Sequence, residues 1–378
     1  MTTLGMSLYS LEGRFMRLTP ISVVAGFAIG ALTLSGCAGS QEEQGQESEF
    51  SVVTSTNVYA DLASQIAGDA ATVEPIISDS TQDPHDYEAT PQDQLKLSKA
   101  DLVVVNGGGY DAFMTTMLEA ADHRPEVIDV VEVSDLPGSE GVTNEPHSHS
   151  HGEEGHSHET DAPQAGHEAE HTHSHEHSSE QAHDHGGEHS HEHETEQGHE
   201  HDHGSFNEHV WYSVPTMEKL AEKLGEQLSQ ELPDSAEAIQ KRTEEVTQQL
   251  HDLHSAIEQV AEKHAGTQVA ATEPVALWLF DDMKLDNVIS EDFLHAVEAG
   301  SDVPPLVLKS AKDKIASGDV KLLAYNTQNA GPQAKELKQV AEENNVPVVD
   351  MAETMPPGTH YAEWMRGYVT AIAQALNG

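Results

Sequence analysis

The chain has 378 residues and a formal net charge of −48, from 66 acidic and 18 basic residues. So acidic a protein is a poor candidate for nucleic-acid binding, which needs a basic surface against the phosphates. The length leaves room for two domains, and the single cysteine, Cys37, excludes an intrachain disulfide.

The N-terminal segment has the features of an export signal. Arg14 and Arg17 precede an apolar run at 21–34 that is too short to span a bilayer comfortably. Small residues then surround Cys37. This order resembles that of a bacterial lipoprotein signal peptide.

The resemblance implies that residues 1–36 are removed and that Cys37 carries a lipid anchoring the protein outside the cytoplasmic membrane. An ordinary signal peptide that happens to contain a cysteine is the alternative. Met16 is an alternative start to Met1. Residues 37–49 are small, polar and acidic, which predicts a flexible tether.

The first lobe is expected to span 50–230. Short β-branched runs alternate there with stretches of helical spacing. Such alternation predicts a mostly parallel sheet with helices on both faces. The strands are expected at 50–54, 72–77, 102–106 and 127–131, and the helices at 58–67, 91–100, 111–121 and 215–231.

A histidine-rich insertion at 145–205 interrupts this lobe. The part from His147 to His203 holds 18 of the 26 histidines and contains no Val, Ile, Leu, Met, Phe, Tyr or Trp. It cannot bury a core and is predicted to be disordered without metal. Imidazole is a common ligand of Zn²⁺, so the stretch is expected to supply accessory metal ligands. These are His147, His149, His151, His171, His173, His175, His177, His199, His201 and His203.

The second half begins with a long helical pattern. Residues 235–264 contain no Gly or Pro and would form a helix about 45 Å long. This predicts a rigid linker helix within 231–266, followed by a second α/β lobe at 267–378. Strands are expected there at 269–272, 321–325 and 346–349, and helices at 291–299, 306–316, 333–343 and 361–376.

Three potential metal ligands lie near the expected carboxyl ends of strands. His85 follows the second strand, His209 lies where regular structure resumes after the insertion, and Glu273 follows the first strand of the second lobe. Open α/β sheets bind their ligands at these ends. Two imidazoles and a carboxylate are a sensible set for Zn²⁺ or Mn²⁺.

Three segments carry a resemblance to a known family. Residues 83–91 with 95–110 (LKLSKADLVVVNGGGY), 207–215 (NEHVWYSVP) and 271–280 (ATEPVALWLF) are similar to motifs of the bacterial zinc/manganese ABC-transporter solute-binding lipoproteins. The likeness runs from Phe50 to the C-terminus, apart from the histidine-rich insertion. It implies two α/β lobes joined by one long rigid helix, with the metal in the cleft between them. It also implies a monomeric receptor that delivers its ion to an ABC permease and is not an enzyme.

The resemblance also implies site residues. His85 and His209 match the family's first-lobe histidines, and Glu273 matches its third ligand. The family usually has an Asp as the fourth ligand, where Asn329 stands in a loop without a carboxylate. An amide oxygen can ligate but leaves charge uncompensated, so either Asn329 is a weak ligand or water completes the coordination shell. Ala89 also departs from the pattern, because the family usually has Pro there.

Zinc is favoured over manganese as the bound ion. A pair of histidines suits the softer Zn²⁺, whereas glutamate suits either ion. The zinc branch of the family often carries a histidine-rich insertion at this place. A manganese receptor of the same family remains the alternative.

Other functions have less support. An extracellular metal buffer or chaperone, in which the histidine-rich insertion is the principal binder, is one alternative, and an adhesin is another. Two H-E-x-x-H matches, beginning at His167 and His199, lie in a segment with no apolar helical face, so they do not indicate a protease. His251 and His254 share a helical face, which favours a solvated surface over a second metal site.

Overall fold

The computed structural model describes residues 50–79, 82, 84–85, 87–140, 142, 206–328 and 330–378. These residues belong to one compact unit, 47–378. Cys37, the histidine-rich stretch and Asn329 lie outside the described residues, so the predictions made for them stay predictions.

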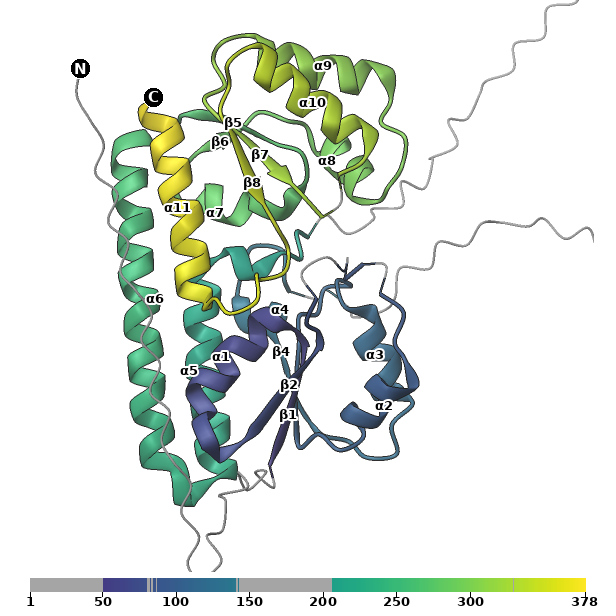
Figure 1. Ribbon diagram of the computed structural model, residues 1–378, viewed down its shortest axis with the longest axis vertical. Coiled ribbons are helices and arrows are strands. Elements are labelled where there is room, and N and C mark those ends of the chain that lie inside the picture. Colours follow the sequence, from purple (N-terminus) through teal and green to yellow (C-terminus); the bar gives the residue numbers. More distant parts are fainter. Residues whose placement is uncertain are drawn as a thin grey trace, which may run out of the picture. The chain divides into compact units, whose positions relative to one another are not determined.

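The first sheet is entirely parallel, with strand order β2-β1-β3-β4. Its central strands are buried because their β-branched and apolar side chains face helices on both sides, as Val52 and Val53 do on opposite faces. Helices α2 and α3 cover one face and α1 the other (Figure 1). The strands are β1 (Ser51–Thr56), β2 (Thr72–Ile77), β3 (Leu102–Val105) and β4 (Glu126–Asp129), and the helices are α1 (Asn57–Ala67), α2 (Pro91–Leu97), α3 (Ala112–Glu119) and α4 (Val130–Ser134).

The second sheet repeats the parallel arrangement with strand order β6-β5-β7-β8. Its strands are short, and β5 and β7 form its buried centre. The strands are β5 (Gln268–Ala271), β6 (Asp286–Asn287), β7 (Leu323–Asn326) and β8 (Val348–Met351), and the helices are α7 (Leu277–Asp282), α8 (Glu291–Glu298), α9 (Pro305–Ala316) and α10 (Pro332–Glu343).

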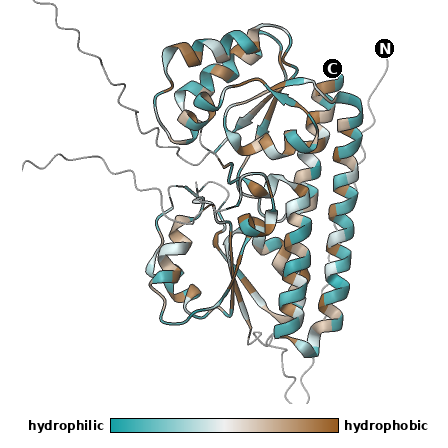
Figure 2. Ribbon diagram, turned by 180° about the vertical axis from the view of Figure 1, so that it is seen from behind, coloured by the Kyte–Doolittle hydropathy of each residue, from teal (hydrophilic) through white to brown (hydrophobic). Residues whose placement is uncertain are grey.

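Three long helices pack beside the two sheets: α5 (Val214–Glu231), α6 (Ala236–His264) and α11 (Tyr361–Asn377). Helix α6 packs against α1 and α5 of the first lobe and against α11, which follows the second sheet (Figure 1). Apolar residues at helical spacing, such as Leu250, Leu253 and Ile257, bury one stripe of α6, while its other face is polar (Figure 2). One hydrophobic cluster therefore continues from the first lobe into the second.

The expected fold class is confirmed: two parallel sheets flanked by helices accompany one long helix. Most expected elements lie within two residues of the observed ones. The expected strand at 127–131 was wrong at its end, because Asp129 accepts a hydrogen bond from the backbone N–H of Glu132 and caps α4 there. The two-residue strand β6 was not expected, and β8 lies two residues further along than 346–349.

Among the described residues, no helix is both long and apolar enough to cross a membrane.

Helices α5 and α6 approach closely at Gly225. A Cβ added there would lie 2.3 Å from Thr243 Oγ1, so any larger residue would overlap with the Thr243 side chain. We expect Gly225→Ala to destabilise the protein by about 1–3 kcal/mol, because overpacking outweighs the better helix propensity of alanine. Urea unfolding measures this. Gly367→Ala in α11 is the matched control, since nothing lies within 4 Å of its added Cβ. That variant should gain about 0.5–1 kcal/mol, and equal effects of the two substitutions would contradict the packing argument.

Candidate metal centre

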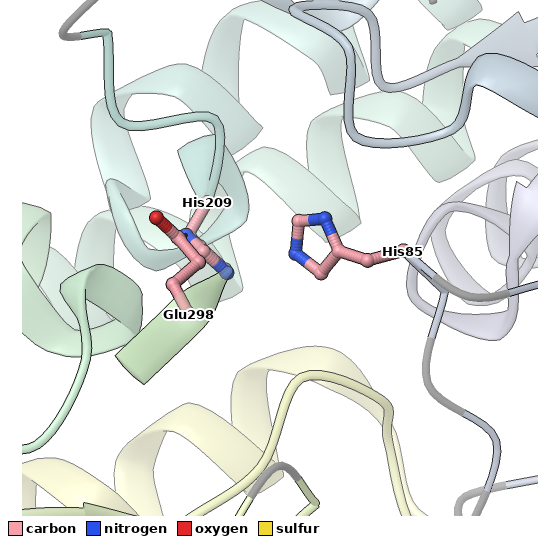
Figure 3. Close-up of side chains that lie close together, drawn as sticks. All are labelled: His85, His209 and Glu298. Atoms are coloured by element: carbon pink, nitrogen blue, oxygen red, sulfur yellow. The ribbon is translucent and has the colours of Figure 1, made fainter. Parts of the chain in front are cut away.

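Two histidines and a glutamate that are distant in sequence meet at one place. One ligand atom from each of His85, His209 and Glu298 lies within 4.8 Å of the other two. His85 lies in the loop after β2, His209 just before the short 3-10 helix η2 (Val210–Tyr212), and Glu298 at the end of α8. The His85 ring faces that of His209, with 5.8 Å between the ring centroids (Figure 3).

The His209 ring is held in one orientation. Its Nδ1 lies 2.8 Å from Asn207 Oδ1, which also accepts a hydrogen bond from the His209 backbone N–H. A donor proton on Nδ1 leaves Nε2 as the nitrogen with a lone pair. His209 is 1 % exposed, and Nε2 makes no hydrogen bond among the described residues. This is the condition of an imidazole prepared to ligate a cation.

Asn207 is itself bonded to the second lobe. Its side-chain amide donates to the Pro274 backbone carbonyl (3.0 Å). Its backbone carbonyl accepts a hydrogen bond from the Trp278 indole N–H (2.8 Å). From the first lobe, the Asn106 amide donates to the Glu208 carbonyl (3.0 Å). The segment carrying His209 is therefore fixed by hydrogen bonds from both lobes.

A second acidic side chain, Glu353, lies between the two histidines. Its Oε2 is 3.8 Å from His85 Nε2 and 3.9 Å from His209 Nε2, and the residue is 1 % exposed. Glu353 follows β8, and Gln328 Oε1 accepts hydrogen bonds from the backbone N–H groups of Glu353 and Thr354. Glu353 thus comes from the carboxyl end of a strand, where this class of sheet places its ligands.

Glu273 is connected to this group through Asn326. The Asn326 amide nitrogen donates to Glu273 Oε2 and to Glu353 Oε1, the latter at 2.8 Å. Two buried carboxylates therefore share one neutral donor. This reduces the repulsion between them but does not neutralise their charge.

Tyr110 forms another wall of the site. Its ring meets the His85 ring edge-on at 4.9 Å between centroids, and its hydroxyl lies 3.3 Å from Glu353 Oε2. The preceding Gly107 has φ +81°, and a Cβ there would lie 2.3 Å from Asp129 Oδ1. The glycine turn therefore lets the chain reverse against β4 and bring Tyr110 to the site.

The protonation states favour a cation. Burial first, and then the charge of His85, hold the pKa of His209 well below its usual value, so its ring is neutral at neutral pH. Burial, followed by repulsion from Glu298, raises the pKa of the Glu208 carboxyl from 4.5 to about 7. Glu208 Oε1 lies 3.9 Å from His85 Nδ1. A divalent cation would relieve this crowding of negative charge.

Of the residues expected from the sequence, His85 and His209 come together, and Glu273 lies next to the group through Asn326. The sequence reasoning missed Glu298 and Glu353. Glu353 could have been found, because it lies just beyond a predicted strand, whereas attention went to the loop of Asn329 after the preceding strand. Glu298 has no such pattern, since it ends a surface helix.

The comparison with protein families identifies the group to which this arrangement belongs. The model described as zinc-uptake complex component A, periplasmic, matches residues 52–375. The chain belongs to this family. A component of an uptake complex binds its solute without converting it, in agreement with the expectation that the protein is not an enzyme.

Curated relatives bear the names of different metals. The zinc-binding lipoprotein AdcA of Streptococcus pneumoniae is 26 % identical over 251 residues, 65 % of this chain and 40 % of that protein. The manganese ABC transporter substrate-binding lipoprotein PsaA of the same species is 34 % identical over 111 residues, 28 % of this chain and 35 % of that protein. The iron-binding protein YfeA of Yersinia pestis is 28 % identical over 131 residues, 35 % of this chain and 41 % of that protein. The chain thus spans about two fifths or less of the length of these relatives.

Solved structures share the fold. The solute-binding protein FpvC of Pseudomonas aeruginosa in complex with Mn²⁺ superposes with a TM-score of 0.58 at 17 % identity, covering 87 % of this chain and 98 % of the other. A crystal structure of ZnuA gives a TM-score of 0.57 at 15 % identity, covering 86 % and 99 %. At such low identity these likenesses establish the fold alone.

The raised pKa of Glu208 should make the metal-free protein sensitive to pH. Between pH 4.5 and about pH 7, Glu208 binds more protons in the folded state than in the unfolded chain. Its contribution therefore lowers the free energy of unfolding as the pH rises through this window. Relative to the unchanged protein, Glu208→Gln should gain up to about 3 kcal/mol at pH 8 and little at pH 5. Urea unfolding in EDTA at both pH values measures the difference. Glu140→Gln in an exposed loop is the control, and an equal effect of Glu208→Gln at both pH values would refute the assignment.

Replacing the shared donor should also destabilise the empty site. Asn326→Asp adds a third carboxylate between Glu273 and Glu353, so we expect a loss of about 2–4 kcal/mol without metal. Saturating Zn²⁺ should recover part of this loss. Thermal unfolding in EDTA and in Zn²⁺ is the measurement, with Asn344→Asp at an exposed helix end as the control. A loss of the same size in both conditions would mean that the charge of the site is not the cause.

Proposed function

We propose that the protein is an extracytoplasmic receptor that binds Zn²⁺ and delivers it to an ABC importer. The observation that carries the proposal is the convergence of His85, His209, Glu298 and Glu353, contributed by both lobes, around a neutral His209 with a free Nε2. Two imidazoles with two carboxylates would leave a bound divalent ion neutral. The family assignment supports the same conclusion.

The direct ligands are proposed to be His85, His209 and Glu353, with Glu298 as the fourth. Glu353 takes the role that the sequence reasoning gave to Asn329. Glu273, expected as the third ligand, either ligates directly or orients Glu353 through Asn326. Both roles would keep its charge within the site.

Zinc is proposed over manganese because two imidazole ligands suit the softer ion. Glutamates are compatible with either metal, and the named relatives include a zinc-binding and a manganese-transport lipoprotein. The histidine-rich stretch adds weight to zinc. We propose that this stretch collects zinc as an accessory, through the histidines named above.

The membrane anchor and the partner of the receptor are proposed from the same family. We propose that Cys37 bears a lipid, that the protein is a monomer tethered to the bacterial cell membrane, and that its partner is the permease of a metal importer. Named relatives are lipoproteins and substrate-binding components of ABC transporters, which supports each of these points except the monomer.

The proposed ligands are tested by zinc affinity. In protein lacking residues 147–203, we expect His85→Ala and His209→Ala each to weaken zinc binding at least about 100-fold, and Glu353→Gln and Glu298→Gln about 10–100-fold. Competition with a chelator of known affinity measures this. His123→Ala, in an exposed loop, is the control and should change nothing. Glu273→Gln distinguishes the two roles of Glu273 by its loss of zinc affinity. A loss like that of the other glutamate variants indicates a direct ligand, and a smaller loss indicates a residue that orients Glu353.

The competing function, a metal buffer based on the histidine-rich stretch, makes a different prediction about stoichiometry. A receptor keeps one tight site after the stretch is deleted, whereas a buffer loses its tight binding. Unchanged affinity in the His85, His209 and Glu353 variants would overturn the receptor.

A further inference from the structure

All three glutamates named in the proposed function have one carboxylate oxygen next to a nitrogen donor. The Asn326 amide nitrogen donates to Glu353 Oε1 (2.8 Å) and also to Glu273 Oε2. His295 Nδ1 lies 3.4 Å from Glu298 Oε2. The glutamates belong to three different parts of the second lobe, one after β5, one at the end of α8 and one after β8, yet they share this arrangement.

The other oxygen of the two proposed glutamate ligands is the one nearest to the histidines. Glu353 Oε2 lies 3.8 Å from His85 Nε2 and 3.9 Å from His209 Nε2. Glu298 Oε1 lies 3.7 Å from His209 Nδ1, beside that ring (Figure 3). One oxygen of each glutamate therefore faces the imidazoles, while its second oxygen is engaged by a neighbouring amide or ring nitrogen.

The orientation of the Asn326 amide is fixed by its other contacts. Its Oδ1 accepts a hydrogen bond from the Gln328 backbone N–H (3.0 Å), and its own backbone N–H donates to Thr272 Oγ1 (3.1 Å). A backbone N–H can only donate, so it determines which end of the amide is the oxygen. Asn326 is 3 % exposed, so water does not compete for its two side-chain N–H groups. Both remain directed at glutamates.

This arrangement limits the number of oxygens that a cation can take. A carboxylate that chelates through both oxygens competes with the donor on its second oxygen, and a buried donor left without its acceptor is costly. One nitrogen from each of two histidines and one oxygen from each of two glutamates make four ligand atoms. Zinc prefers a tetrahedron of such ligands, whereas Mn²⁺ prefers an octahedron rich in oxygen.

We propose that Asn326 and His295 are positioning residues that set the specificity of the site. By engaging one oxygen of each glutamate, they hold the site to four ligand atoms and so favour zinc over manganese. This inference rests on the proposed receptor function, because it concerns the ion taken by the same site. Asn326 acts within the protein through Glu273 and Glu353, whereas the His295 side chain is 45 % exposed and acts from the surface through Glu298.

The test compares two ions at one histidine of the full chain. The side chain of His85 is 24 % exposed, so diethyl pyrocarbonate can modify it, and mass spectrometry reads the modification at that residue alone. Free Zn²⁺ or free Mn²⁺ is raised in chelator-buffered solution, so the histidine-rich stretch does not deplete the ion. His123, in an exposed loop, is the internal reference. The quantity compared is the Mn²⁺ concentration that half-protects His85 divided by the corresponding Zn²⁺ concentration.

We expect Asn326→Leu to lower this ratio at least about tenfold. Leucine has nearly the shape of asparagine but donates no hydrogen bond, so both glutamates become free to chelate and supply the oxygens that Mn²⁺ prefers. Asn326→Ser should give an intermediate ratio, because one hydroxyl donates to only one of the two glutamates. His295→Ala should lower the ratio about threefold, since water replaces part of an exposed donor.

Asn106→Leu is the matched control. Asn106 is also buried, but its side chain donates to the backbone carbonyls of Gly107 and Glu208 and not to a ligand carboxylate. Its loss should weaken both ions alike and leave the ratio unchanged.

The outcomes separate this inference from the proposed function. A ratio that keeps its original value in Asn326→Leu and in His295→Ala overturns the inference, even if both ions bind more weakly, because a purely structural role gives that result. His295→Ala decides the question if Asn326→Leu does not fold. If neither ion protects His85 in the unchanged protein, the receptor function itself fails.

Discussion

Negative charge buried beside neutral imidazoles is the constraint on which the centre of this molecule depends. Glu208, Glu298 and Glu353 crowd around His85 and His209, and Glu273 joins them through Asn326. Burial makes each of these charges costly, and the lowered pKa of His209 means that it does not supply a compensating proton at neutral pH. A divalent cation would compensate this negative charge, which is what the proposed receptor site requires.

The fold holds this group of side chains together from both lobes. The loop that carries Glu353 belongs to the second lobe by sequence, yet it is bonded to α1 of the first. Asn57 donates to the Met355 carbonyl and accepts from its N–H, and Asp61 accepts from the Tyr361 N–H. With α6 packed along helices of both lobes, these contacts favour small adjustments over a wide hinge.

One amide side chain also connects the loops that carry ligands of the central site. Gln328 donates to the Gln82 carbonyl near His85 and accepts from the backbone beside Glu353, so one amide connects the two loops that bring ligands from opposite lobes. The protein thus positions the oxygen and nitrogen ligands of the proposed site with hydrogen bonds, and a cation would balance their charge.

By itself, the sequence determined the fold class, the long helix and the two histidines. Alternating strand and helix periods, and the 30-residue pattern without Gly or Pro, are local features, so they can be read without knowing the tertiary structure. His85, His209 and Glu273 were found because each stands beside a strand end or a motif. The pairing of Glu298 and Glu353 with the imidazoles was decided by the tertiary structure. Glu298 comes from a helix end and Glu353 from a different loop than the one expected, and only the approach of the two lobes brings them to the imidazoles. The pairing of Glu218 with His251 and His254 likewise depends on how α5 lies against α6. Contacts between segments far apart in the chain are set by packing, which local residue patterns do not record.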